Sequence, residues 1–310
     1  MTLRSTRSRY PHGMSKPFLW LGPARLPFLV LTPACIVLGV ACVQWTQGQV
    51  NLPQALLVLL GAVAAHISVN AFNEYQDFRS GLDALTQRTP FSGGSGVLPA
   101  HPELASSTLA MAVGCLATSI GVGLYFVALR GPALLSLGVA GVALVLIYTQ
   151  WITRHPLLCL MAPGLGFGPL MILGTHVALT GEYSGTAAAA SLVPFFLVNN
   201  LLLLNQFPDA EADRRVGRRH LLITSGPAIA ARWYAAFTAL AFVSIPLGVL
   251  LGLLPAGALL GVLGLALALP TVRDVLTHAL DVERLLPAMG RNVLISLLTP
   301  LLMAIGMLMS

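Results

Sequence analysis

The stretch LPQALLVLLGAVAAHISVNAFNEYQDFRSGLD, residues 52–83, joins about twenty almost entirely apolar residues to a cluster of charged ones. The apolar part is long enough to cross the roughly 30 Å hydrocarbon core of a bilayer as a helix. Glu74, Asp77, Arg79 and Asp83 lie at its end, although charged residues make up only 9% of the chain. We therefore expect a membrane-spanning helix that ends in a functional acidic cluster.

The rest of the chain repeats this apolar pattern. Of its 310 residues, 56% are hydrophobic, and the mean hydropathy is +0.82. This composition is typical of a polytopic membrane protein and excludes an ordinary soluble domain. Because helices satisfy their own backbone groups in lipid, we expect an all-α bundle of about nine transmembrane helices. The expected spans are residues 26–46, 53–76, 105–129, 132–149, 156–180, 187–208, 228–251, 255–270 and 286–309.

The basic residues predict how these spans are oriented. With the N-terminus in the cytoplasm, every Lys and Arg except Arg130 lies on the cytoplasmic side, which is the bias that membrane proteins show. The formal net charge of +6 is then a topology signal, and we expect no nucleic-acid partner. The sequence predicts a multi-pass protein of the cell membrane, in contact with membrane lipid. It would have a basic cytoplasmic segment at residues 1–25 and one transmembrane domain at residues 26–310.

A second acidic cluster ends the sixth expected span. It reads NQFPDAEAD, residues 205–213, and shares with the first cluster an Asn followed four residues later by Asp. Residues four apart lie on one face of a helix, so each cluster presents its oxygens in one direction at the cytoplasmic end of its span. Because spans two and six carry the clusters, we expect a duplicated four-helix unit whose two sites face each other.

Carboxylates clustered at a membrane boundary require cations, because like charges repel and desolvation is costly. Mg²⁺ suits them, since it prefers hard oxygen ligands and commonly bridges one or two carboxylates to a substrate phosphate. Neither cluster has enough ligands to enclose a metal alone, which points to a phosphate or diphosphate as the remaining ligand. The candidate Mg²⁺ ligands are Asn73, Asp77, Asp83, Asn205, Asp209 and Asp213.

Arginines follow both clusters and provide groups that can bind such an anion. A guanidinium holds phosphate oxygens through two parallel hydrogen bonds. The candidates for diphosphate binding are Arg79, Arg88, Arg215 and Arg218. The nearby segment FSGGSG, residues 91–96, either offers backbone N–H groups to the same anion or is only a flexible turn.

A polar stripe continues the Asp77 face farther into the second span. His66, Asn70 and Asn73 precede Asp77 at intervals of four, three and four residues. Such a stripe either extends a polar cavity into the membrane or forms a hydrogen-bonded seam between two helices.

The two motifs resemble those of the UbiA superfamily of intramembrane prenyltransferases. That family has nine transmembrane helices, with Asp-rich motifs on the second and sixth that bind Mg²⁺ and an isoprenyl diphosphate. Asn73, Glu74 and Asp77 are similar to its usual Asn-Asp-x-x-Asp, and Asp209 and Asp213 are similar to the second motif. The resemblance implies a UbiA-like helical bundle.

Further segments resemble the MenA-like branch, which prenylates dihydroxynaphthoate in menaquinone synthesis. They are DFRSGLD at 77–83, Tyr148 with Thr149, and GLGFGPLMILGT at 164–175. Two positions depart from that branch. Phe167 stands where these proteins usually carry an acidic residue, and His220 replaces a usual Thr. We expect these departures to affect the choice of acceptor and not the binding of diphosphate.

The resemblance implies a Mg²⁺-dependent prenyltransferase that moves an isoprenyl or polyprenyl group from its diphosphate to a hydrophobic or aromatic acceptor. In that mechanism Asp77, Asp209 and Asp213 are catalytic through the metal, and Tyr148 borders the allylic cation.

Two other classes share some of these features. A CDP-alcohol phosphotransferase also uses Mg²⁺ and aspartates at the membrane boundary, but it carries them in one compact motif. A polytopic transporter places its acidic residues in the middle of broken helices, whereas these clusters lie at span ends.

Overall fold

The computed structural model describes residues 19–310, which fold into helices without any strand. The all-α prediction is confirmed. Of the expected basic segment, residues 1–18 lie outside the described residues. The longer helices are α2 (Leu31–Gln47), α3 (Leu52–Ser80), α6 (Ala105–Arg130), α7 (Ala133–Ile147), α8 (Pro156–Leu165), α9 (Met171–Thr180), α10 (Gly185–Arg215), α12 (Pro227–Leu250), α13 (Leu265–His278) and α14 (Val282–Leu308).

Shorter elements connect these helices. Three are short α-helices, α4 (Leu82–Leu85), α5 (Val97–Ala100) and α11 (Leu221–Ser225). The 3-10 helices are η1 (Gly22–Ala24), η2 (Leu26–Phe28), η3 (Pro102–Leu104), η4 (Ile152–Arg154) and η6 (Ala256–Gly264). A π-helical turn, η5 (Gly166–Leu170), joins α8 to α9.

The number of spans differs from the expected nine. Among residues 19–310, seven helical stretches are long and apolar enough to cross a membrane, and the bent pair Gly22–Phe28 with Leu31–Gln47 makes up to eight. The expected fourth span is α7, which has only 15 residues. At 1.5 Å per residue α7 is about 22 Å long, shorter than the roughly 30 Å hydrocarbon core. The multi-pass architecture is confirmed, but the count of nine is not.

Local signals explain where the helices that carry the motifs begin and end. The Asn51 side chain caps α3 by accepting a hydrogen bond from Gln54 N–H at 3.0 Å. Ser184 caps α10 in the same way, with Ala187 N–H as the donor at 3.3 Å. Gly81 ends α3 in the left-handed conformation, with φ of 77°, which glycine adopts without strain. The chain therefore turns sharply within the first acidic cluster.

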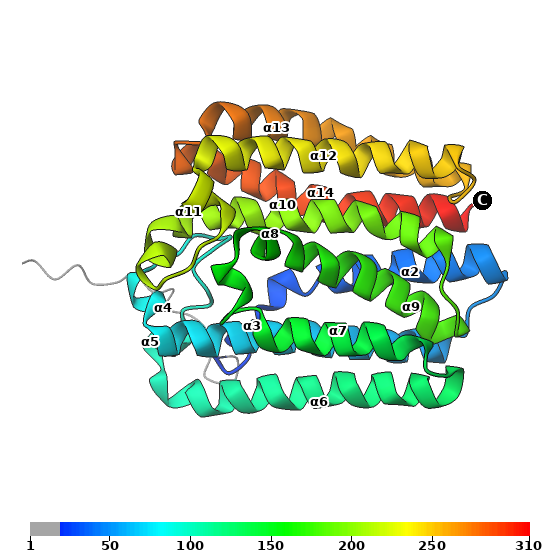
Figure 1. Cartoon of the computed structure of the whole chain (residues 1–310), viewed down its shortest axis with the longest axis horizontal. Helices are drawn as coiled ribbons and strands as arrows, with labels where there is room; N and C mark the ends of the chain where they lie inside the picture. The colour runs from blue at the N-terminus through cyan, green and yellow to red at the C-terminus, as the bar shows by residue number, and fades with distance from the viewer. Residues whose placement is uncertain (1–18) are drawn as a thin grey trace, which may run out of the picture.

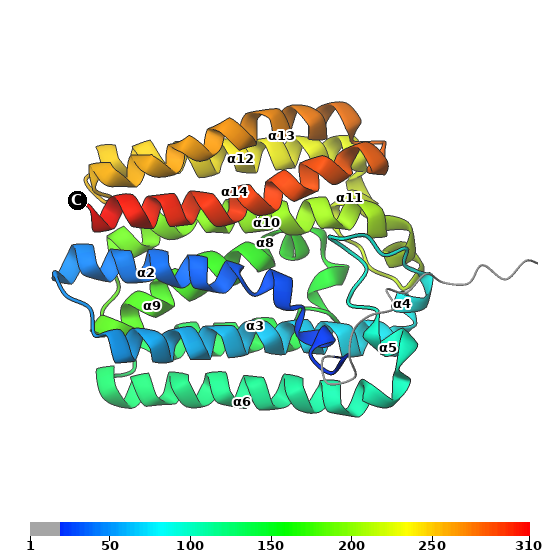
Figure 2. The same cartoon turned by 180° about the vertical axis from the view of Figure 1, so that it is seen from behind.

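Both acidic clusters lie at the same end of the bundle. Figures 1 and 2 show the helices lying lengthwise beside one another, with α4, α5 and α11 at one end and the C-terminus at the other. α3 leads into α4 and α10 leads into α11, so α3 and α10 both stop at the end that holds the short helices. We call this end the motif end.

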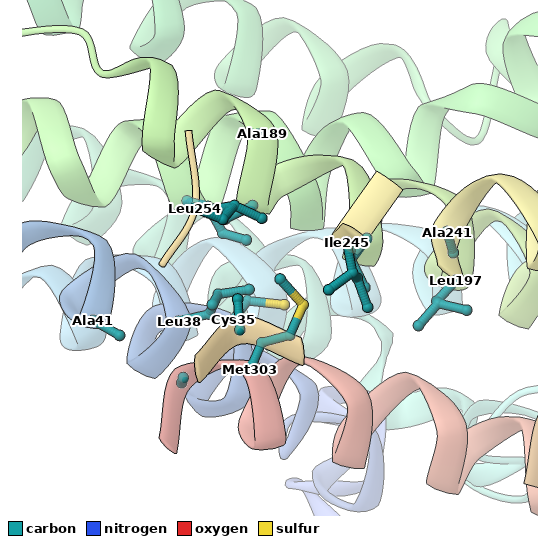
Figure 3. Close-up of a cluster of buried hydrophobic side chains, with 14 of the residues drawn as sticks. Cys35, Leu38, Ala41, Ala189, Leu197, Ala241, Ile245, Leu254 and Met303 are labelled. Carbon is teal, nitrogen blue, oxygen red and sulfur yellow. The ribbon is translucent and has the colours of Figure 1, made fainter. Parts of the chain in front are cut away.

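Small side chains let the helices of the core pack closely. A cluster of buried residues from α2, α10, α12, α14 and the turn before η6 is shown in Figure 3, where Cys35, Leu38, Ala41, Ala189, Leu197, Ala241, Ile245, Leu254 and Met303 are labelled. Gly164 brings α8 against α10, because a Cβ there would lie 2.1 Å from the Phe195 carbonyl oxygen. Its N–H also donates to Asn199 Oδ1 at 2.6 Å. Such small residues at helix contacts are typical of membrane proteins.

Candidate active site

A cavity of about 620 Å³ lies between α3 and α10 and reaches the motif end. Its walls also include residues 21–31, the loop that joins α4 to α5, and parts of α8, η5 and α14. The two acidic clusters, which are far apart in the sequence, thus border one site. The candidate residues that line it are Asn73, Asp77, Asp83, Arg88, Tyr148, Asn205, Asp209, Asp213 and Arg218.

Arg218 lies between the two clusters. Its Nη1 donates to Asp213 Oδ1 at 2.9 Å, and its Nη2 forms an ion pair with Asp77. Gly217, with φ of 84°, turns the chain after α10, and Arg218 N–H then bonds to the Asp213 carbonyl oxygen at 3.0 Å. Burial opposes the charge on Arg218, but Asp77 and Asp213 outweigh it, so the pKa of the guanidinium is raised. A cation of the chain itself therefore joins the two motifs.

His220 also contacts the second motif, a contact that the sequence did not predict. Its Nε2 donates to Asp213 Oδ2 at 3.0 Å, so both carboxylate oxygens of Asp213 are hydrogen-bonded. His220 is 1% exposed. Only its position close to an Asp motif could have indicated this contact.

Other oxygens of the candidate metal ligands have no partner. Asp83 Oδ2, Asn205 Oδ1 and Asp209 Oδ1 are buried and accept no hydrogen bond from any residue in 19–310. An unpaired buried oxygen is costly, so these atoms, which belong to residues that line the cavity, are suited to bind a cation there. Burial, with the nearby charges of Glu74 and Asp77, raises the pKa of Asp83 to about 7. The donor set consists of carboxylate and amide oxygens and fits Mg²⁺.

Glu74, in the first acidic cluster, forms hydrogen bonds with Arg25 and Ser95. It is completely buried, and its carboxylate accepts hydrogen bonds from Arg25 Nε at 2.8 Å, Ser95 N–H at 2.6 Å and Ser95 Oγ at 2.7 Å. Arg25 also donates to Asn73 Oδ1 at 3.0 Å. Glu74 therefore ties both the η1–η2 segment and the loop before α5 to α3. The predicted boundary at residues 25 and 26 passes through this contact, and the domain division itself stays a prediction.

Arg88 is held in the wall of the cavity by glycines of the FSGGSG segment. A Cβ on Gly96 would lie 2.0 Å from Arg88 Nη1, and a Cβ on Gly93 would lie 2.9 Å from the Arg88 Cα. Both glycines have positive φ, 69° and 84°, and Arg88 Nε donates to the Gly94 carbonyl oxygen at 3.3 Å. The segment is thus a defined turn that wraps around an arginine.

Arg79 and Arg215 are candidates that the structure does not bring to the cavity. Each lies two residues after an aspartate that borders it, and residues two apart do not share a helix face. Both side chains are exposed, and Arg215 pairs with Glu211 at 3.2 Å. Of the four arginines predicted to bind diphosphate, Arg88 and Arg218 line the cavity and Arg79 and Arg215 do not, and the role of each stays a prediction.

The polar stripe of α3 lines the cavity and also forms hydrogen bonds to neighbouring segments. It is therefore both a polar extension of the cavity and a hydrogen-bonded seam. His66 Nδ1 is 2.8 Å from Thr32 Oγ1, and Asn70 Nδ2 donates to the Ala24 carbonyl oxygen at 3.0 Å. Both residues line the cavity, and Phe167 lines it beside them. The site therefore has charged groups at the motif end and a mixed polar and aromatic wall deeper in the bundle.

A multi-helix membrane bundle in which two Asn/Asp motifs face one cavity is the arrangement expected of an intramembrane prenyltransferase. The chain belongs to the UbiA prenyltransferase family, whose sequence model matches residues 30–281. This confirms the resemblance to the superfamily that the motifs indicated.

Curated relatives belong to one branch of that family. The chain is 27% identical to the 1,4-dihydroxy-2-naphthoate octaprenyltransferase of Bacillus subtilis (strain 168) over 201 residues, which is 63% of this chain and 62% of that protein. The protein of the same name from Escherichia coli (strain K12) is 26% identical over 309 residues, 96% of this chain and 97% of that one. These relatives confirm the resemblance to the MenA-like branch.

Solved structures share the fold. A UbiA homolog from Aeropyrum pernix K1, solved in the apo form, is 19% identical with a TM-score of 0.69, covering 92% of this chain and 98% of that one. A UbiA homolog from Archaeoglobus fulgidus, bound to GPP and Mg²⁺, is 14% identical with a TM-score of 0.63, covering 94% and 100%. At these identities the likeness shows the fold alone.

Proposed function

We propose that this chain transfers an isoprenyl group from its diphosphate to an aromatic acceptor of quinone biosynthesis. One observation carries the proposal: two clusters of oxygen ligands and three arginines, Arg25, Arg88 and Arg218, face a cavity whose other walls are largely apolar. The charged end suits a diphosphate, and the apolar walls suit an isoprenyl chain. The names of the curated relatives make 1,4-dihydroxy-2-naphthoate the first acceptor to test.

Mg²⁺ is the cofactor that the ligand set fits. Asp77, Asp209 and Asp213 would hold it, assisted by Asn73, Asp83 and Asn205. When bound, the metal neutralises negative charge on the departing diphosphate. Among residues 19–310, no group of three or more His, Cys, Asp or Glu side chains forms a metal site by itself, so oxygens of the diphosphate and water would complete the coordination. The A. fulgidus homolog bound to GPP and Mg²⁺ supports this assignment.

The chain's own residues would bind and orient the substrates. Arg218 and Arg88 bind diphosphate oxygens, since both line the cavity and offer planar guanidinium forks. The bond between C1 of the isoprenyl group and the diphosphate oxygen breaks, and its electron pair leaves with the diphosphate. A carbon of the acceptor ring then bonds to C1, and the ring loses a proton. Tyr148 borders the cavity next to Cys159, and the apolar walls exclude water from the reacting carbon.

We place the site on the cytoplasmic side of the cell membrane. In the expected topology, all Lys and Arg residues but Arg130 lie on the side of the motif end. Both substrates have apolar portions and would reach the cavity from the surrounding lipid.

The substitution Asp77→Asn tests the proposed reaction. It keeps the size of the side chain but removes a charged oxygen ligand, so we expect the transfer rate to fall at least about a hundredfold. EDTA should produce the same loss in the wild-type protein, and Mg²⁺ should reverse it. The measurement is release of diphosphate from a polyprenyl diphosphate in the presence of 1,4-dihydroxy-2-naphthoate.

Asp274→Asn is the matched control. Asp274 also forms an ion pair with an arginine, Arg291, but it does not line the cavity. We expect this variant to retain most activity. Full transfer by Asp77→Asn in monodisperse protein would contradict the proposal. A transporter would move substrate without divalent metal and release no diphosphate, and a CDP-alcohol phosphotransferase would release CMP.

A further inference from the structure

Two histidines have almost the same local setting, but only one of them borders the cavity. His66 on α3 is 6% exposed, and His176 on α9 is 2% exposed. Each is hydrogen-bonded to a threonine of α2: Thr32 Oγ1 lies 2.8 Å from His66 Nδ1, and Thr46 Oγ1 lies 3.0 Å from His176 Nε2. The two form a natural comparison within one molecule.

Their second ring nitrogens differ. His176 Nδ1 lies 2.9 Å from the Glu182 carbonyl oxygen and 3.2 Å from Thr180 Oγ1, so both nitrogens of this ring are bonded and its role is structural. His66 Nε2 has no hydrogen-bond partner anywhere in residues 19–310, and the ring lines the cavity. This nitrogen is therefore free to bond to a ligand in the cavity, although the rest of the imidazole is buried.

The neighbours of His66 suit an aromatic ligand with a polar group. Phe167 also lines the cavity, and its ring meets the His66 ring edge to face with centroids 4.8 Å apart. Asn70 lies one turn nearer the motif end. Its amide nitrogen bonds to the Ala24 carbonyl oxygen, whereas its side-chain oxygen has no hydrogen-bond partner among the described residues. This part of the wall therefore combines two polar groups with an aromatic face.

The same depth of the opposite wall is apolar. When the Asn/Asp pairs of the two motifs are aligned, His66 and Asn70 on α3 correspond to Val198 and Leu202 on α10, and all four line the cavity. The two helices are thus alike at the motif end and differ deeper in the bundle. An isoprenyl chain fits the α10 side, which leaves the α3 side for the acceptor.

We propose that His66 binds a ring hydroxyl of a phenolic or hydroquinone acceptor, with Phe167 packed against the ring, an assignment that rests on the proposed function. His66 lies 11 residues before Asp77, about 16 Å along the helix axis, which leaves room for a diphosphate, the reacting carbon and one ring in line. Either tautomer of His66 can serve, because a hydroxyl both donates and accepts.

His66→Phe tests this site, because it keeps an aromatic ring beside Phe167 and removes both nitrogens. With 1,4-dihydroxy-2-naphthoate we expect the KM for the acceptor to rise about tenfold and the KM for the diphosphate donor to change less than about twofold. His176→Phe is the matched control, since it breaks the equivalent bond to a threonine outside the cavity. It should leave both KM values unchanged.

A mono-O-methyl ether of the same acceptor separates binding from a general structural effect. The wild-type protein should prefer the free hydroxyl over the ether about tenfold, and His66→Phe should lose most of that preference. His66→Gln, which restores a hydrogen-bonding group, should recover part of it and serves as the second variant if His66→Phe does not fold.

Three results would overturn the assignment. One is an equal preference for the hydroxyl in wild type and in the His66 variants. Another is a donor KM that rises as much as the acceptor KM, which would place His66 against the isoprenyl chain. The third is no transfer by wild type to either acceptor, although other aromatic acceptors are prenylated, which would refute a site for this hydroxylated ring and leave the proposed transfer reaction standing.

Discussion

Replacing Glu74 by Ala should destabilise the motif end strongly. Glu74 is fully buried, and Arg25 and Ser95 donate three hydrogen bonds of 2.6–2.8 Å to its carboxylate. At about 1 kcal/mol for each lost bond, the free energy of unfolding should fall by about 3 kcal/mol. This is the lower end of the range for breaking a buried ion pair, about 3–5 kcal/mol, because the Arg25 side chain is 24% exposed and can be rehydrated.

Glu211→Ala is the control for this prediction. Glu211 also pairs with arginines, Arg215 at 3.2 Å and Arg214 at 3.5 Å, but its side chain is 66% exposed. Its loss should therefore cost less than about 1 kcal/mol. Unfolding in detergent, followed by circular dichroism, measures the free energies, and trypsin cleavage at Arg88 reports whether the loop before α5 has been released. Equal stability and equal protection of Arg88 in the two variants would refute the reasoning.

Three further predictions use matched pairs or close contacts. Arg88→Ala should raise the KM for the diphosphate donor about tenfold, whereas Arg79→Ala, outside the cavity, should leave it unchanged in the same assay. Gly96→Ala should raise the same KM by up to about tenfold, since the new Cβ would lie 2.0 Å from Arg88 Nη1 and φ is 69°, and a wild-type KM would contradict this. Gly164→Ala should lower the free energy of unfolding by about 1–3 kcal/mol, because it separates α8 from α10. Gly174→Ala, with no atom within 4 Å of the new Cβ, should not, and equal losses in detergent unfolding would count against the packing argument.

The meeting of the two motifs follows from sequence reasoning because it depends on simple periodicities. An Asn and an Asp four residues apart share a helix face, and both motifs end long apolar runs. The same geometry, applied more strictly, would have placed Arg79 and Arg215 on another helix face than the aspartates that border the cavity, since each lies two residues from one of them.

Contacts that depend on loops could not be predicted in this way. Arg218 reaches Asp77 only because Gly217 reverses the chain, and Arg25 reaches Glu74 across 49 residues of sequence. Neither contact can be recognised from the spacing of residues in the sequence, because each depends on how distant helices and loops pack together. The number of spans could not be predicted from the sequence either, since hydropathy does not distinguish a short apolar helix such as α7 from a full span.

The position of Arg218 has a consequence for how the protein assembles in the membrane. Without it, closing α3 onto α10 would bring Asp77 and Asp213 together as like charges with little water between them. With Arg218 between them, the newly inserted bundle can close before any metal or substrate arrives. If Mg²⁺ binds as proposed, folding of the chain would then not require it, and EDTA should leave a folded protein that regains activity when Mg²⁺ is restored.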